Sequence, residues 1–340
     1  MENEKFKVGI PIEMYVCLKR DAEQFEVYRD DGSGINMNGF LSLLIVNYYR
    51  KYKQERNEKT VQIREMIGPW VHSQKKSEEL AEQIMEKVVL PPEQVRGGMN
   101  PNRLSITPTR VSDKYITEIK DKYGKHFAQY LSRMFISYCE EALCDRERII
   151  FRESTDFLVK ACKERREIVF TTSNNPKLIH HVIPYDLVVG ADEMNNYLLG
   201  QEFINITGRN EPVSFRLCRI IDPDYAETSG TLDKNVIQNL EKMKKHSPQY
   251  AITEDSNICV RLTPAGQRSY RQIYFARPAV DRVEKLENGD ALYYFNAPPD
   301  LVFRFVIRFR AGEAEVITPP ELRERVYKHF RESALLYEKE

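Results

Sequence analysis

The chain has 340 residues, of which 41% are hydrophobic and 30% are charged, so it can bury a substantial core and is not a disordered chain. Lysine and arginine together number 51, and aspartate and glutamate also number 51. The resulting formal charge of zero excludes a protein that coats duplex DNA through a global basic field.

Length and apolar patterning set the remaining bounds. At roughly 100–200 residues per domain, the chain is expected to form two or three domains. No apolar run reaches the ~18–20 residues of a membrane span, and the first residues lack a signal-peptide layout. We therefore expect a cytoplasmic protein with no membrane partner, whose six cysteines are reduced thiols.

The first predicted elements are a strand and two helices. Lys5 to Ile10 alternates polar and apolar residues, which is the period-two pattern of a strand. After Pro11, apolar residues recur at three- and four-residue steps on a first helix. A turn at 30–34 separates it from a second helix, which is expected from about Met37 to Lys53.

The same order of elements returns later in the chain. Arg103 to Pro108 predicts another short strand, and an amphipathic helix that ends at Gly124 and a further helix from near His126 follow it. The residues from Phe40 to Tyr48 align with those from Tyr130 to Tyr138 at an offset of 90 (130 − 40), and the strands align at an offset of 96. We interpret the two copies as a tandem repeat within one chain.

Between and after the copies the patterns are weaker. A helix from Ser77 to Val89 is expected to place Leu80, Ile84 and Val88 on one face, and an irregular loop spans 90–102. A helix from Asp145 leads into a strand-rich region from 168 to about 221.

The end of the chain predicts a further unit beyond a polar segment with one helix near 232–245. Strands are expected near Ile258–Leu262, Ala291–Phe295 and Val302–Phe309, and a closing helix over Pro320–Tyr337. The whole is of the α+β class, with expected domains at 1–145, 146–225 and 255–340 and a linker at 226–254.

Motifs of enzymes are missing from the sequence. It contains no Walker loop, no H-E-x-x-H, no G-x-S-x-G and no dinucleotide fingerprint. The adjacent histidines His180 and His181 would point to opposite faces of a strand, which suits no shared metal. We therefore predict a binding protein without catalytic residues, metal or cofactor.

The N-terminal strand and helices resemble the ribbon-helix-helix fold, in which two strands pair as an antiparallel ribbon that enters the major groove. The resemblance implies that Lys5 and Lys7 face outward toward nucleic acid, whereas Phe6, Val8 and Ile10 face the core. The start of the second helix, at 36–38, would offer free N–H groups to a phosphate. A scaffold that binds no DNA remains the alternative for this region.

The middle of the chain resembles a WYL domain. The family's Trp, Tyr and Leu correspond to Asn196, Tyr197 and Leu198, and its F-R-L-D-R-I stretch stands as residues 215–220 with Cys218 in place of Asp. The resemblance implies a small Sm-like β-barrel. Residues 309–322 resemble the family's C-terminal extension, which implies a homodimer through 255–340.

Four residues of this region are the candidate contacts for unpaired nucleic acid. Arg216 and Arg219 can bind phosphates with their planar guanidinium groups, and Tyr197 and His181 can stack on bases. Strand alternation predicts an exposed Arg216. In the alternative reading, Tyr197 is a core residue and the arginines pair with Asp186 or Glu202.

Three functions remain open at this stage. The resemblance implies an accessory that binds single-stranded RNA, or single-stranded DNA, and modulates an RNA-targeting type VI CRISPR effector. The second reading is a transcription factor whose ribbon binds duplex DNA while the WYL domain senses an effector. The third is an interaction scaffold that binds no nucleic acid.

Overall fold

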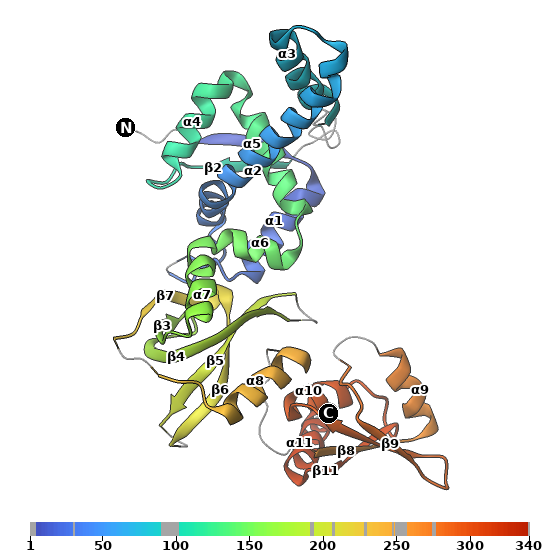
Figure 1. Ribbon diagram of the computed structural model, residues 1–340. Helices are drawn as coiled ribbons and strands as arrows, with labels where there is room; N and C mark the ends of the chain where they lie inside the picture. Colours follow the sequence, from blue (N-terminus) through green and yellow to red (C-terminus); the bar gives the residue numbers. More distant parts are fainter. Residues whose placement is uncertain are drawn as a thin grey trace. The chain divides into compact units, whose positions relative to one another are not determined.

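The computed structural model describes residues 5–29, 31–89, 102–190, 194–205, 208–227, 230–246, 248, 257–273 and 277–338. The chain separates into two compact units, Met1–Thr155 and Asp156–Glu340. In Figure 1 the first unit runs from blue to green and is mainly helical, whereas the second, from green to red, combines antiparallel sheets with helices. The predicted α+β character is confirmed at this level.

The first unit is built on a two-stranded ribbon and the helices that follow each strand. Its elements are β1 (Phe6–Ile10), α1 (Ile12–Gln24), α2 (Met37–Ile67), η1 (Gly68–Trp70), α3 (Gln74–Ile84), η2 (Met85–Val89), β2 (Asn102–Ile106), α4 (Asp113–Tyr123), η4 (Gly124–His126), α5 (Phe127–Glu140) and α6 (Leu143–Ile150).

The pairing of β1 with β2 follows the internal repeat. The strands are antiparallel, and Val8 lies opposite Leu104, which is the residue 96 positions further on (104 − 8). An antiparallel ladder centred on two equivalent residues is symmetric about a two-fold axis. Ile10 and Ile106, again 96 apart, are both fully buried beneath it. The intramolecular pairing predicted from the repeat is therefore confirmed.

The helices α2 and α5 fill the core with the residues that aligned at an offset of 90. Rings from both copies meet there, with centroid distances of 6.3 Å for Phe40 and Tyr138 and 6.0 Å for Tyr48 and Tyr138. Five of the six aligned apolar pairs are buried: Phe40, Leu41, Leu44, Ile45 and Tyr48 with Tyr130, Leu131, Met134, Phe135 and Tyr138. The sixth pair, Val46 and Ile136, is partly exposed.

Two expectations for these helices are wrong in detail. Helix α2 continues to Ile67 instead of ending near Lys53, because no helix breaker occurs before Gly68 and Pro69. On α3 the buried residues are the small Ser77 and Ala81, which allow close packing on α2.

The apolar face predicted for this segment is instead partly exposed. Leu80 and Val88 are 39% and 68% exposed, whereas Met85, one turn after Ala81, is buried. Of the predicted loop 90–102, all but Asn102 lies outside the described residues.

The second unit contains two sheets. The first comprises β3 (Ile168–Thr172), β4 (Asn175–Val189), β5 (Asn196–Ile204), β6 (Arg209–Arg216), η5 (Leu217–Arg219) and β7 (Ile220–Tyr225), preceded by α7 (Arg152–Glu164) and followed by α8 (Lys234–His246). All neighbouring strands are antiparallel, in the order β6-β5-β4-β3-β7.

The predicted β-barrel requires a correction. Within the described residues the hydrogen-bonded ladder ends at β6 on one side and β7 on the other, so the sheet is open. The short turn η5 joins these two strands directly. Helix α8, which falls in the expected linker 226–254, packs Val236, Leu240 and Met243 against Leu199 of β5.

The other sheet of this unit has the order β11-β8-β10-β9. Its elements are β8 (Asn257–Leu262), α9 (Pro264–Gln272), β9 (Arg282–Lys285), β10 (Ala291–Asn296), α10 (Pro299–Val306), β11 (Ala314–Thr318) and α11 (Pro320–Tyr337).

The strand predicted over Val302–Phe309 is wrong, because this segment begins in helix α10. Its buried residues Val302, Phe305, Val306 and Phe309 recur at steps of three, one and three, which is a helical period, and Pro299 starts the helix. These side chains fill the core of the sheet's own domain. The apolar strand that motivated the expected dimer is therefore absent.

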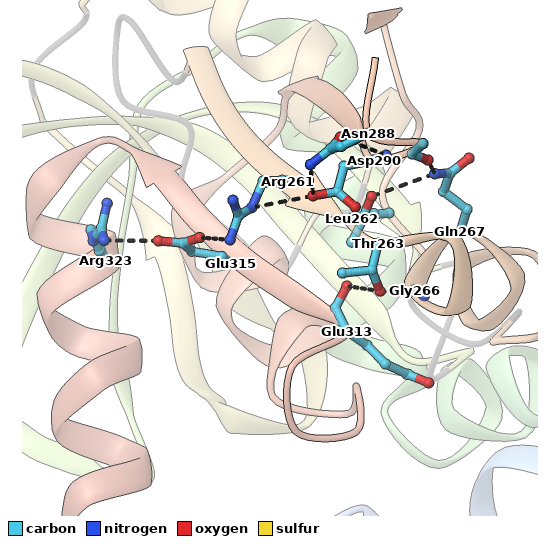
Figure 2. Close-up of polar contacts among 11 residues, drawn as sticks. Arg261, Leu262, Thr263, Gly266, Gln267, Asn288, Asp290, Glu313, Glu315 and Arg323 are labelled. Atoms are coloured by element: carbon cyan, nitrogen blue, oxygen red, sulfur yellow. Dashed lines mark hydrogen bonds and ion pairs between the residues drawn. The ribbon is translucent and has the colours of Figure 1, made fainter. Parts of the chain in front are cut away.

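Polar contacts fasten the helices of this domain to its sheet (Figure 2). The Glu315 carboxylate binds Arg261 at 2.6 Å and Arg323 of α11 at 2.8 Å. Thr263 caps α9 by accepting from the Gly266 N–H at 3.2 Å. A Cβ at Gly266 would lie 2.1 Å from the Glu313 carbonyl oxygen, so only glycine fits at this approach.

Candidate nucleic-acid interface

The outward face of the ribbon carries three cations. Lys5, Lys7 and Arg103 are exposed, and Lys7 lies opposite Ser105 across the ladder. In the described part of the chain, none of the three forms a salt bridge with an acidic side chain. The structure thus places Lys5 and Lys7 on the outward surface predicted for them.

A fourth cation lies close to the ribbon, and the sequence patterns did not single it out. Lys120 of α4 lies over the ring of Phe6 at 5.4 Å and over that of Phe127 at 5.3 Å. The two rings themselves pack edge to face at 5.2 Å. The only sequence signal for this arrangement is the lysine on the polar side of the amphipathic helix.

At the beginning of α2, where a phosphate site is predicted, the fold already uses one backbone N–H and two asparagine side chains. The Asn36 side chain caps the helix by accepting from the Gly39 N–H at 2.8 Å. Asn38 accepts from the Thr107 N–H at 2.8 Å and donates to the Thr107 carbonyl at 3.1 Å. Both asparagines therefore serve the fold, and Asn38 ties the end of the ribbon to α2.

In the second unit, the structure brings Tyr197 and Arg216 together. They lie opposite each other on β5 and β6, so their side chains share one face of the sheet. Arg216 is half-buried and donates to the Asn195 side-chain oxygen at 3.0 Å. Arg219 follows three residues later in η5 and is also half-buried.

Tyr197 does not offer the exposed ring that stacking requires. Its side chain is only 7% exposed, and a Cβ at Gly190 would lie 3.0 Å from the ring. Glycine at 190 therefore leaves room for the tyrosine ring. The reading of Tyr197 as a core residue agrees with this burial, whereas the predicted stacking role does not.

His181 is remote from this pair. It lies on β4 seven residues before Val188, the residue opposite Tyr197 (188 − 181), which corresponds to roughly 20 Å at ~3.3 Å per residue. Its side chain is 60% exposed, with Nδ1 3.5 Å from Glu167. The four predicted contacts thus do not form one cluster.

The acidic partners considered for the arginines are used elsewhere. Asp186 binds Lys244 at 2.6 Å. Glu202 binds the buried His180 through Nδ1 at 3.0 Å, and the His180 ring packs against Phe170 and Phe215. His180 and His181 therefore face opposite sides of β4, as predicted. The sequence pattern did not predict that His180 and Glu202 form a largely buried pair.

Each half of the helical unit contains a buried arginine, 90 residues apart (146 − 56). Arg146 donates to Asp21 at 2.6 Å through Nε, and Asp21 also accepts from Tyr138 at 3.1 Å. Arg56 binds Glu82 and Glu86 at 2.9 and 2.8 Å, both from the inserted segment between the copies. Asp21 is completely buried, whereas the Glu82 side chain is 52% exposed.

Comparisons with known proteins give a fold but no family. No protein-family model and no curated protein matches the chain. A solved structure described as the crystal structure of a CRISPR Cas-related protein is 20% identical, with a TM-score of 0.71, over 99% of this chain and 94% of that one.

A second solved structure, proteasome accessory factor B/C (PafBC) of Arthrobacter aurescens, is 14% identical, with a TM-score of 0.28 over 82% of this chain and 46% of that one. That score is too low to indicate a shared fold. Across nearly its full length, the chain is therefore similar in fold to the CRISPR Cas-related protein alone of these two.

No helix within the described residues combines the length and apolarity of a membrane span.

Proposed function

We propose that the chain is a non-enzymatic, nucleic-acid-binding regulator of a CRISPR system, which binds single-stranded RNA through the second unit. The fold shared with a CRISPR Cas-related protein over 99% of the chain supports the CRISPR link. In this proposal the protein acts as an accessory to an RNA-targeting CRISPR effector, and it works in the cytoplasm.

The architecture underlying this proposal combines two modules. We assign the β1–β2 ribbon and its two helix pairs to the ribbon-helix-helix type, because the ladder is centred on the equivalent residues Val8 and Leu104. We assign the five-stranded sheet, preceded by α7, to the WYL type, with Asn196, Tyr197 and Leu198 at the start of β5.

The observation that carries the RNA proposal is the arrangement of arginines at the end of β6. Arg216 is held by Asn195, so its guanidinium is already oriented, and Arg219 lies three residues further on. Oriented guanidinium groups form strong, geometrically defined bonds to phosphates. A site of this size suits a few nucleotides of a flexible strand rather than a long duplex.

The direct experiment is a titration of the full chain against labelled single-stranded RNA, single-stranded DNA and duplex DNA of equal length, at several salt concentrations. We expect the tightest binding to single-stranded RNA. Equal and weak binding to all three nucleic acids would contradict the proposal and favour a scaffold that binds no nucleic acid.

The ribbon supports a second candidate function, the binding of duplex DNA as a transcription factor. The observation in its favour is the exposed row of Lys5, Lys7 and Arg103 on the outward face. Gly9, opposite Arg103, has no side chain to contact a base. Each phosphate contact adds a slope of about −0.9 to the salt dependence of duplex binding, so three cations predict a shallow slope of about −3.

We also propose a homodimer, and the surface that supports it is helix α11 rather than the strand predicted from the sequence. Helix α11 buries only Leu322 among its described residues, whereas its large apolar side chains at Tyr327, Phe330, Leu335, Leu336 and Tyr337 are 44–88% exposed. A second copy would cover them. Sedimentation of the full chain should show a dimer that Phe330→Glu weakens; a monomer at all concentrations would refute it.

A further inference from the structure

Two cysteines from different copies of the repeat lie together in the helical unit. Cys139 of α5 donates its thiol to the Met14 carbonyl of α1 at 3.9 Å, and Met14 is three residues before Cys17. The Cys17 sulfur itself lies 4.0 Å from the Asp21 carboxylate on the same helix. Both cysteine residues are partly exposed.

The surroundings favour the reactive form of one thiol and not of the other. The Cys139 thiol lies within hydrogen-bond reach of the Cys17 sulfur, and this contact lowers the pKa of the Cys17 thiol to about 7. Arg146 and Arg20 act in the same direction, whereas burial and Asp21 oppose it. The same contact, with burial, raises the pKa of Cys139. The contact therefore favours ionisation of Cys17 over ionisation of Cys139, and the thiolate is the nucleophilic form of a cysteine.

We propose that Cys17 and Cys139 are an oxidation-sensitive pair that a hydroperoxide converts into an intramolecular disulfide between α1 and α5. The proposal does not rest on the function proposed above.

The chemistry balances in two steps. The Cys17 thiolate attacks one oxygen of hydrogen peroxide, so that an S–O bond forms and the O–O bond breaks. The leaving hydroxide takes up the proton that Cys17 released on ionisation and departs as water. Cys139 then attacks the Cys17 sulfur; the S–S bond forms, the S–O bond breaks, and the hydroxyl departs as water with the Cys139 proton. Two thiols and one peroxide give one disulfide and two waters, with two electrons passing to the peroxide.

The new bond would fasten the elements that carry β1. Helix α1 follows β1 after Pro11, and Ser132 of α5 donates to the Gly9 carbonyl of β1 at 2.7 Å. The bond would also close a loop of 122 residues (139 − 17), which restricts the unfolded chain. Oxidation should therefore stabilise the helical unit and hold its two halves together.

The remaining cysteines provide controls. Cys162, Cys218 and Cys259 are buried at 8%, 8% and 5% exposure and lie in the other unit. Cys144 is partly exposed and lies on α6 of the same unit as the pair. Cys144→Ser therefore tests whether partial exposure alone determines which thiols oxidise.

The experiment treats the full chain with hydrogen peroxide, removes the excess with catalase and counts thiols in denaturant. The wild type should fall from six thiols to four and return to six with dithiothreitol, and peptide mapping should find Cys17 linked to Cys139. Cys144→Ser should likewise lose two thiols. Neither Cys17→Ser nor Cys139→Ser should form an intramolecular disulfide.

Peptide mapping of the oxidised wild-type chain tests the proposal even if a cysteine variant fails to fold. Six thiols that survive peroxide, or a mapped disulfide that joins any other two cysteines, would overturn the proposal. So would the loss of two thiols in Cys17→Ser or Cys139→Ser.

Discussion

The ribbon and the end of the five-stranded sheet both present cations, but they hold them differently. On the ribbon, Lys5, Lys7 and Arg103 extend from exposed positions of a regular ladder. At the sheet, Arg216 is half-buried and fixed by Asn195. Flexible exposed cations supply long-range attraction that salt screens, whereas an oriented guanidinium supplies a defined bond. This difference predicts general affinity at the ribbon and specific binding at the sheet.

The largest expected effect is on the stability of the helical unit that carries the ribbon. Asp21→Ala would leave the Arg146 guanidinium buried without its carboxylate, at a cost of about 3–5 kcal/mol of unfolding free energy. Amide hydrogen exchange of α1 and α5 measures this loss. The control Glu82→Ala removes a half-exposed partner of Arg56, which retains Glu86, and should cost under about 1 kcal/mol. Equal losses would contradict the account of the buried pair.

A smaller effect is expected in the sheet. Glu202→Ala would leave the buried His180 ring without its hydrogen-bond partner, which costs about 1–3 kcal/mol. Glu202→Gln retains an oxygen and an N–H at this place and should cost less. Hydrogen exchange of β4 and β5 reports both. If Ala and Gln have the same effect, the bond to His180 does not contribute to stability.

The smallest effect is expected on RNA affinity when the lysines of the ribbon are replaced. The double substitution Lys5→Ala and Lys7→Ala should change the free energy of single-stranded RNA binding by less than about 0.5 kcal/mol, since the proposed site at Arg216 and Arg219 lies in the other unit. The same variant should make the salt slope of duplex binding shallower by about 2, one unit per lysine. If the double lysine variant no longer binds RNA, the RNA site lies on the ribbon and not at the sheet.

The sequence predicted the ribbon better than the sheet site. Alternation along 5–10 and the offset of 96 correctly placed Val8 and Ile10 inside and Lys5 and Lys7 outside, because a two-stranded ribbon on helices has one buried and one exposed face. At the sheet, alternation predicted an exposed Arg216. Instead the side chain is half-buried, because a residue before β5, Asn195, binds it.

One of the other errors was a wrong choice of period, and the rest have causes that no single-sequence pattern contains. In Val302–Phe309 the arginines at 304 and 308 lie four residues apart and Pro299 precedes them, so the sequence itself favoured the helix. On α3 the small residues Ser77 and Ala81 are buried, whereas the larger Leu80 is partly exposed. Tyr197 is buried because Gly190, after the end of β4, leaves room for its ring. These last two outcomes depend on contacts between distant segments.

The most direct test of the central claim compares three arginines, two on β6 and one on η5, in single-stranded RNA binding. Arg216→Ala and Arg219→Ala should each weaken binding by about 1–3 kcal/mol, the range for hydrogen bonds to a charged group. Arg209, at the far end of β6 with a 67% exposed side chain, is the matched control, and Arg209→Ala should leave the affinity nearly unchanged. Unchanged affinity in the Arg216 and Arg219 variants, measured on chains that hydrogen exchange shows to be folded, would contradict the claim.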